Sequence, residues 1–239
     1  MALPWYNTPV FFLNSASMST LTKNKKNASW QTSYAQIQMA PEYLEYVRER
    51  IKQAGINLCG RDILDIGCGP GAYIQCALEH SPRLLTGLDV SPFYLQGIRA
   101  QTPQSTGVLA SAMQLPFADN SYDVVFLNEI LFHVDAIATL AEVRRILRPG
   151  GTLWVSHHLA GYYWGKIFWR KGRPLKTYII EALSSAKRLM EPIYGSKRTT
   201  YTHPARLTRW LRPLRVQRQW VHRKDGLPCV VEMVAVKPE

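Results

Sequence analysis

The stretch RDILDIGCGPGAYIQCA, residues 61–77, decides the fold of this chain. A short apolar run that contains Asp65 is followed by three glycines at alternate positions, Gly67, Gly69 and Gly71. A glycine-rich turn between a strand and a helix lets a ligand approach the backbone, next to the unpaired N–H groups of the helix N-terminus. The stretch therefore predicts a strand, a ligand-binding turn and a helix.

The rest of the chain continues this alternation of strands and helices. We expect strands near 62–67, 84–90, 107–110, 122–128, 151–157, 215–222 and 230–236. We expect helices near 41–54, 72–80, 92–101, 136–147 and 204–211. Near-continuous apolar runs such as YDVVFL suit strands buried on both faces, and helices between them imply right-handed crossovers. The sequence thus predicts an α/β fold with a doubly wound, mostly parallel sheet.

Two regions do not fit the alternation. Residues 1–40 are polar, and TKNKKNAS at 22–29 resembles a flexible linker before a short helix around Tyr34. The second region is an insertion rich in aromatic and basic residues. We expect an N-terminal lid or flexible segment at 1–40, followed by a core at 41–158. The insertion is expected at 159–203, and a final helix with the last strands of the core at 204–239. RPGG at 148–151 is expected to end one helix and turn the chain into the next strand.

Charge is unevenly distributed along the 239 residues. The segment 159–224 has sixteen Lys and Arg against two acids, a net +14, whereas the remainder sums to −2. The predicted partner of this segment is anionic: a substrate, a nucleic acid or a lipid surface.

Cysteine usage and the N-terminal sequence indicate the compartment. The four cysteines form no CxxC pair and no zinc or disulfide spacing, so we expect a reduced setting and no metal site. The longest apolar run near the N-terminus, PVFFL, is too short for a signal peptide core or a membrane span. The expected protein is cytoplasmic and attaches at most to a membrane surface.

The glycine turn allows two interpretations. Gly67, Gly69 and Ala72 satisfy G-x-G-x-x-A, and Asp89 lies where a ribose-binding acid is expected, which favours a dinucleotide. The same stretch also reads D-x-G-x-G-x-G, in which Asp65 brings a carboxylate close to the turn. A carboxylate there suits a ligand with an ammonium group and is unfavourable beside a pyrophosphate.

Four segments together resemble a known family. DILDIGCGPGAY resembles the first motif of the class I S-adenosylmethionine-dependent methyltransferases, and LTGLDVSP at 85–92 is similar to the second. LPFADNSYDVVFLNEILFHV at 115–134 and LAEVRRILRPGGTLWVS at 140–156 are similar to later motifs of the type 11 branch, which includes ubiquinone and menaquinone methyltransferases. The resemblance covers roughly 41–157. It implies a Rossmann-like, seven-stranded sheet with a final antiparallel hairpin, S-adenosyl-L-methionine as cofactor and S-adenosyl-L-homocysteine as product.

The resemblance also implies residues that hold the cofactor. Gly67, Gly69 and Gly71 leave room for its methionine part, Asp65 is oriented toward its ammonium group, and Asp89 accepts hydrogen bonds from the ribose diol. Charge-assisted hydrogen bonds of this kind contribute about 1.5–3 kcal/mol each.

Further residues complete this predicted cofactor site. Val90, Ser111 and Ala112 are expected to line the adenine, and Ser111 stands where many relatives have an aspartate. Asn128 is expected near the sulfonium, and Tyr34 is expected to close the site.

Methyl transfer needs a general base only if the nucleophile must lose a proton. The candidate catalytic residues are His133, His157, His158 and Tyr163. His157 and His158 follow the fifth strand at the edge where open α/β sheets bind ligands, and alternation sends only one of them toward the pocket. Which of the two faces the pocket is left open by the sequence.

Acceptor specificity is expected in the insertion. Its candidate acceptor-binding residues are Tyr162, Trp164, Lys166 and Arg170. Their mixture of aromatic and basic side chains favours a small or lipophilic, anionic acceptor with an O, N or C nucleophile, and a membrane surface would use the same features. RNA is a less favoured acceptor, although the arginines of RLTRWLRPLRVQR at 206–218 recur at three-residue intervals. Two other classes remain open, a nicotinamide-dependent oxidoreductase and a non-catalytic cofactor-binding protein.

Overall fold

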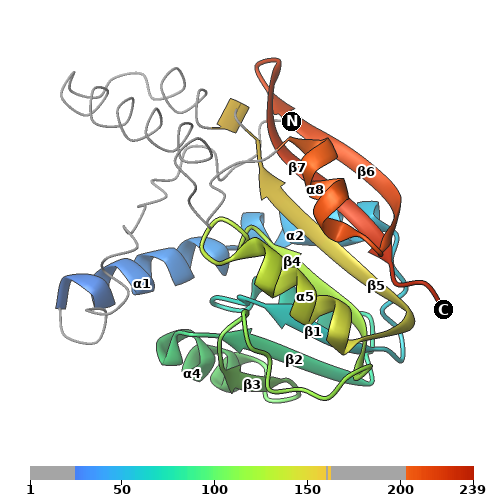
Figure 1. Cartoon of the computed structure of the whole chain (residues 1–239). Helices are drawn as coiled ribbons and strands as arrows, with labels where there is room; N and C mark the ends of the chain where they lie inside the picture. The colour runs from blue at the N-terminus through green and yellow to red at the C-terminus, as the bar shows by residue number, and fades with distance from the viewer. Residues whose placement is uncertain (1–24, 160, 163–202) are drawn as a thin grey trace.

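The computed structural model describes residues 25–159, 161–162 and 203–239 (Figure 1). Its seven strands form one sheet in the order β3-β2-β1-β4-β5-β7-β6, in which β7 runs antiparallel to its neighbours. The strands are β1 (Asp62–Ile66), β2 (Leu84–Asp89), β3 (Thr106–Leu109), β4 (Tyr122–Asn128), β5 (Leu147–His158), β6 (Arg215–Lys224) and β7 (Leu227–Val236). The predicted doubly wound sheet and its final hairpin are confirmed.

Helices cover both faces of the sheet. One face carries α2 (Pro41–Ala54), α3 (Ala72–Leu78) and α4 (Pro92–Gln101), and the other carries α5 (Ala136–Ile146) and α8 (Pro204–Leu211). Local sequence sets several of their ends. Pro41 begins α2 and Gly55 ends it in the left-handed conformation, while the Asp135 side chain accepts hydrogen bonds from the first turn of α5.

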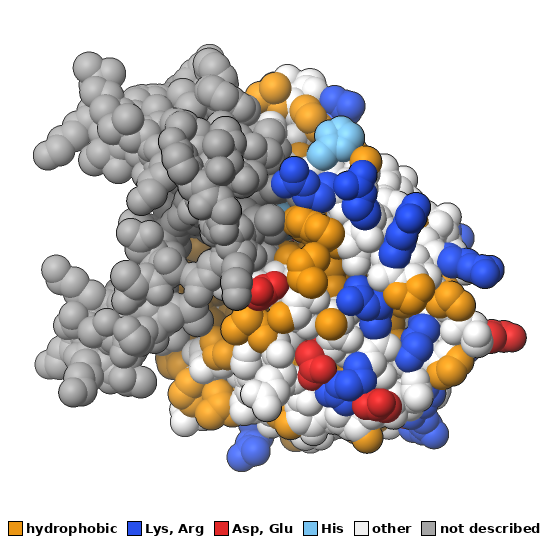
Figure 2. Space-filling model, in the orientation of Figure 1, with side chains coloured by type: hydrophobic (Ala, Val, Ile, Leu, Met, Phe, Trp, Pro, Cys, Tyr) orange, Lys and Arg blue, Asp and Glu red, His pale blue; other side chains and the backbone are white. Residues whose placement is uncertain are grey.

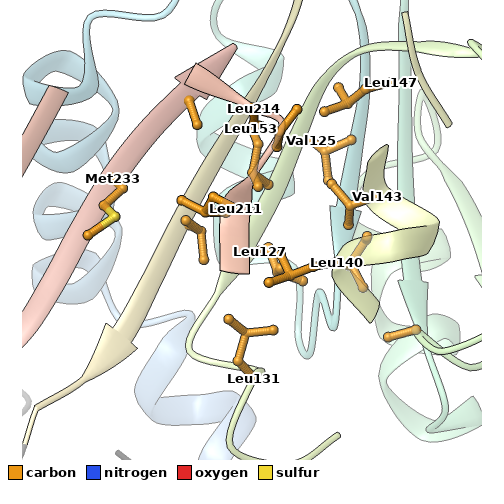
Figure 3. Packing of buried hydrophobic residues seen from close by; sticks show 14 of the residues in the cluster. Val125, Leu127, Leu131, Leu140, Val143, Leu147, Leu153, Leu211, Leu214 and Met233 are labelled. Atoms are coloured by element: carbon orange, nitrogen blue, oxygen red, sulfur yellow. The ribbon is translucent and has the colours of Figure 1, made fainter. Parts of the chain in front are cut away.

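The core on the α5 face is made by aliphatic side chains. Figure 3 shows Leu140 and Val143 of α5 directed toward Val125 and Leu127 of β4, in a cluster that also includes Leu211 of α8. The central strands are buried on both faces, as their unbroken apolar runs predict. This packing fixes the ends of β1, β4 and β5, where the candidate site lies.

The N-terminal segment differs from the prediction. Residues 25–29 were expected to be a linker, with only a short helix around Tyr34, but Lys25–Gln38 forms one continuous helix, α1. Its sequence has almost no apolar periodicity, so the main signal of an amphipathic helix is missing. In Figure 1, α1 lies on the side toward which the arrow of β5 points.

The RPGG segment also differs from the prediction. It was expected to lie before the strand, but β5 begins at Leu147 and includes 148–151. Leu147 pairs with Tyr122, and the register then shifts so that Val124 pairs with Thr152. Gly150, at φ 72°, permits this irregularity because it has no side chain to clash in the left-handed region.

Two structural expectations concern membranes and metals. None of the helices within 25–159, 161–162 and 203–239 is long and apolar enough to cross a bilayer. The same residues contain no group of three His, Cys, Asp or Glu that could hold a metal ion.

Candidate active site

The candidate site lies where the strand order reverses direction. β1 pairs with β2 on one side and with β4 on the other, and the chain continues from β1 to β2 but from β4 to β5. Crevices at the carboxyl ends of parallel strands form at such a reversal. The residues that follow β1, β2 and β4 therefore share one edge of the sheet.

The glycine turn after β1 has the backbone that its sequence predicts. Gly67, Gly69 and Gly71 have φ values of 71°, 50° and 97°. A Cβ on Gly67 would collide with Ile130, and one on Gly71 would lie 2.9 Å from Ile98 Cγ1. All three positions favour glycine for its backbone conformation, and Gly67 and Gly71 also lack space for a side chain.

Asp89 ties the turn to the end of β2. One carboxylate oxygen accepts from Gly69 N at 2.9 Å, and the other accepts from Ser91 N at 2.8 Å. Burial raises the pKa of Asp89, while these backbone hydrogen bonds oppose the rise. Each oxygen keeps a second lone pair, so the carboxylate can still accept hydrogen bonds from a vicinal diol.

Two polar groups at this edge have no partner within the described residues. Asp65 Oδ2 and Asn128 Nδ2 are both buried and form no hydrogen bond there. Burial, and secondarily the charge of Asp89, raise the pKa of Asp65 to about 8. A buried polar group without a hydrogen-bond partner lowers stability. The Asp65 oxygen can accept from an ammonium group and the Asn128 nitrogen can donate to a carboxylate, so the two suit a ligand that has both groups.

Helix α1 lies over the glycine turn. A Cβ on Gly69 would lie 3.9 Å from Tyr34 Cε1, and Tyr34 stacks on Trp30 with ring centroids 5.5 Å apart. Gln38 donates to the Tyr34 hydroxyl at 2.6 Å, and Gln31 donates to the Ser91 hydroxyl at 3.1 Å. The expected closing residue Tyr34 thus adjoins the turn.

The predicted adenine wall lies beyond Asp89. Val90 is 53% exposed at the end of β2, while Ala112 is buried in the turn that follows β3. Ala110 N donates to Asp89 O at 3.2 Å, which brings this turn next to Val90. Ser111 is turned back on its own segment, because its hydroxyl accepts from Met113 N at 3.2 Å.

A carboxylate and an imidazole meet beside Asn128. Glu129 Oε2 lies 3.5 Å from His158 Nε2, and the His158 ring stacks on Tyr162 with centroids 3.9 Å apart. Phe132 lies on the same histidine at 4.7 Å. Burial alone would raise the pKa of Glu129, but the hydrogen bond and charge of His158 outweigh it and the pKa is lowered.

The backbone at Glu129 is unusual. Its φ is 56°, which is uncommon for a residue other than glycine, and its N–H donates to the carbonyl and the hydroxyl of Ser156. Strained conformations of this kind concentrate at functional sites. Sequence analysis overlooked Glu129, because nothing in LNEILFHV predicts its backbone conformation.

The other predicted catalytic residues have different surroundings. His157 is fully buried, its two nitrogens have no partner in the described part of the chain, and burial lowers its pKa to about 3. His133 is exposed and its ring lies 4.2 Å from Phe132. Tyr163, Trp164, Lys166 and Arg170 lie outside the described residues.

A buried ion pair lies beneath the site. Arg50 of α2, only 3% exposed, donates to Glu232 at 2.9 Å, to Tyr73, and to Asn128 Oδ1 at 3.5 Å. Glu232, with no exposed surface, also accepts from Trp154 Nε1 at 2.8 Å. The network links α2, β4, β5 and β7, and its bond to Asn128 leaves Nδ2 of that amide available to a ligand. The sequence signal for this buried network is Arg50, because this charged residue falls on the apolar stripe of α2.

The Asp65 carboxyl gives the first prediction. At pH 7 this group is protonated, and a bound ammonium group lowers its pKa, so binding of S-adenosylhomocysteine is expected to release up to about one proton. Calorimetric titrations in two buffers of different ionisation enthalpy measure this release. Asp65→Asn should abolish it, whereas equal binding heats in both buffers for the unchanged protein would contradict the assignment.

The same shift affects stability without ligand. Between about pH 4 and pH 8 the folded state holds a proton on Asp65 that the unfolded state has lost. The contribution of Asp65 to the free energy of unfolding therefore falls as the pH rises through this interval.

The residues at this edge fit S-adenosylmethionine. The turn has three glycines, Asp89 offers a carboxylate to a diol, and the unpaired atoms of Asp65 and Asn128 match an amino acid moiety. A dinucleotide fits less well, because a carboxyl group beside the turn is unfavourable near a pyrophosphate.

Comparison with known proteins agrees with this geometry. Residues 64–155 match the family model described as "Methyltransferase domain". The O-methyltransferase resE of Aspergillus sclerotiorum is 36% identical over 127 residues, which are 48% of this chain and 48% of that protein. The tRNA U34 carboxymethyltransferase of Nautilia profundicola is 33% identical over 115 residues, 46% of this chain and 38% of that protein. The chain spans about half the length of the curated relatives it matches.

Solved structures share the fold over most of the chain. An S-adenosylmethionine-dependent methyltransferase from Mesorhizobium loti superposes with a TM-score of 0.61 and 18% identity, covering 84% of this chain and 99% of that one. The fold, the family match and the relatives agree: residues 64–155 match a methyltransferase domain, within a fold that this chain shares with solved S-adenosylmethionine-dependent methyltransferases.

Proposed function

We propose that this protein transfers a methyl group from S-adenosylmethionine to a hydroxyl oxygen of a small or lipophilic molecule. The observation that carries the proposal is the pairing of a complete cofactor cradle with the Glu129–His158 pair at the same edge of the sheet. When bound, S-adenosylmethionine supplies a methyl group on a sulfonium, a good leaving group for in-line displacement.

The chain's own residues bind and orient the two reactants. Asp89 holds the ribose, Asp65 and Asn128 hold the amino acid end, and Tyr34 covers the turn. Val90 and Ala112 flank the adenine on the side of β3. Because positioning alone can supply much of such a rate, these contacts are the main contribution of the protein.

The Glu129–His158 pair accepts the acceptor's proton. Glu129 is the more accessible member, with 29% of its side chain exposed against 3% for His158. An acceptor hydroxyl that donates to Glu129 passes its proton to that carboxylate, which His158 holds in place from its other side. The lowered pKa of Glu129 keeps that carboxylate ionised at neutral pH.

The charges at the site restrict the acceptor. Glu129 keeps its negative charge at this edge, so an uncharged hydroxyl is favoured over an anion at the reacting end. Anionic groups elsewhere on the acceptor would be met by the basic residues of 163–202, which include Lys166 and Arg170. Two of the similar proteins are named O-methyltransferases, which agrees with an oxygen nucleophile.

The proposal is tested with methyl-labelled S-adenosylmethionine. The protein is incubated with the label and a cell extract, and the lipid, small-molecule, RNA and protein fractions are counted separately. Label in the lipid or small-molecule fraction is expected. Label confined to RNA would show that the acceptor is RNA and would contradict the proposal. No label in any fraction would indicate a cofactor-binding protein without transferase activity.

Variants of the pair test its role in the reaction. Glu129→Gln and His158→Gln are each expected to lower the rate of label transfer by about 10²- to 10⁴-fold, the usual contribution of general acid–base catalysis. Binding of S-adenosylhomocysteine should persist in both variants. His80→Gln is the matched control, an exposed histidine that follows α3, and should retain the original rate. Equal rates in all three variants would refute a proton-accepting role.

A further inference from the structure

The exposed surface of α8 and β6 differs in charge from the rest of the described chain. Between residues 204 and 223 there are six arginines and no lysine, aspartate or glutamate. Figure 2 shows Lys and Arg side chains gathered at the upper right, over the α8 and β6 side of the molecule. We use the name arginine ridge for four of these residues, Arg206, Arg209, Arg212 and Arg215.

The arginine ridge is exposed because the opposite side of α8 is buried. Leu207 and Leu211 pack into the core, so the intervening positions Arg206 and Arg209 face solvent. Arg212 and Arg215 follow at the end of the helix and at the start of β6, and both are exposed. All four side chains are therefore exposed, and they recur at three-residue intervals along the chain.

The ridge lacks the ion pairs that arginines make elsewhere in this protein. Arg48, Arg83, Arg145 and Arg148 each contact a carboxylate within 3.0 Å. Within 25–159, 161–162 and 203–239, no carboxylate lies within ion-pair distance of any of the four ridge residues. Edge strands often carry charges that prevent aggregation, but this reason does not apply to Arg206, Arg209 and Arg212, which lie outside β6.

We infer that the arginine ridge binds the phosphate backbone of a nucleic acid. Arginine presents a planar fork that contacts phosphate oxygens in pairs, and its exclusive use over lysine is typical of phosphate recognition. Along α8, which rises about 1.5 Å per residue, Arg206 and Arg209 are roughly 4.5 Å apart, comparable to the spacing of about 3.4 Å per phosphate along one duplex strand. The inference is independent of methyl transfer, since this binding requires no cofactor.

A lipid surface fits the ridge less well. The exposed large apolar side chains in the described part of the chain are Leu84, Val90, Phe93, Leu109, Met113 and Ile137. None of them lies on α8 or β6, whereas interfacial helices insert an apolar face beside their basic one. The apolar face of α8 is already occupied by the core.

The test measures binding of the full chain to a fluorescent 20-base-pair DNA hairpin without cofactor, as a function of salt. Each phosphate contact contributes about 0.9 to the slope of log K against log salt concentration. The triple variant Arg206→Gln/Arg209→Gln/Arg212→Gln is therefore expected to reduce the slope by roughly 2 to 3. Its binding of S-adenosylhomocysteine, which reports a folded core, should be unchanged.

A charge-matched variant provides the control. Lys52→Gln/Arg61→Gln/Arg99→Gln removes the same three charges from exposed positions elsewhere and should keep the original slope. Equal losses in both triple variants would show that only net charge matters and would overturn the inference. So would binding to vesicles of phosphatidylcholine and phosphatidylserine without binding to the hairpin.

Discussion

Replacing Asp89 by alanine is expected to weaken the binding of S-adenosylhomocysteine by about 10²- to 10⁴-fold. The carboxylate already accepts from Gly69 N and Ser91 N, so it is fixed in position before any ligand arrives. Two charge-assisted hydrogen bonds to a ribose diol, at about 1.5–3 kcal/mol each, account for a loss of this size. The measurement is a calorimetric titration of each variant with S-adenosylhomocysteine.

The control separates loss of the ligand contact from loss of the fold. Asp119→Ala removes a carboxylate that is 70% exposed and pairs with Arg145, and it should bind the ligand normally. Asp89→Ala should still unfold cooperatively in urea, although the amides of Gly69 and Ser91 lose their acceptor. Near-normal affinity in a folded Asp89→Ala protein would disprove the ribose assignment.

Replacing Arg50 by methionine is expected to lower the free energy of unfolding by about 3–5 kcal/mol. Glu232 has no exposed surface, and without Arg50 its charge would remain buried, with Trp154 and His222 as its side-chain partners among the described residues. The guanidinium also lies 5.4 Å from the ring centroids of both Tyr73 and Trp154, contacts that methionine cannot replace electrostatically. Urea unfolding monitored by circular dichroism measures the loss.

A double variant distinguishes the unpaired charge from lost packing. In Arg50→Met/Glu232→Gln the buried charge is gone, while the amide oxygen can still accept from Trp154 Nε1. The double variant is therefore expected to be more stable than Arg50→Met alone. If instead the decreases in the free energy of unfolding caused by the two single substitutions simply add, an unpaired carboxylate is not the cause of the instability of Arg50→Met.

The parts of the site that follow local rules could be predicted from the sequence. The glycines of 67–71 and Asp89 occupy short-range positions whose backbone or spacing is dictated by the strand, the turn and the helix. The sheet could also be predicted from the sequence, because the apolar residues of buried strands and of amphipathic helices recur with different periods. Tyr34 lies beside Gly69 as expected, although the helix that carries it is much longer than predicted.

The parts that depend on contacts distant in sequence could not be predicted. Arg50 and Glu232 are separated by 182 positions, and the residues around each of them in the sequence do not indicate that the two form an ion pair. Glu129 and His158 meet because β4 and β5 end side by side. The left-handed backbone at Glu129 goes with the hydrogen bonds that its N–H donates to Ser156 and is not signalled by its residue type. A charged residue within an apolar stripe, such as Arg50 or Glu232, predicts only that some partner exists.

The central claim is that the edge formed by β1, β2 and β4 binds S-adenosylmethionine rather than a nicotinamide dinucleotide. Calorimetric titration of the full chain with S-adenosylhomocysteine and, separately, with NAD tests this most directly. The account predicts saturable binding of one S-adenosylhomocysteine per chain and no measurable heat with NAD. Saturable binding of NAD, with none of S-adenosylhomocysteine, would contradict it.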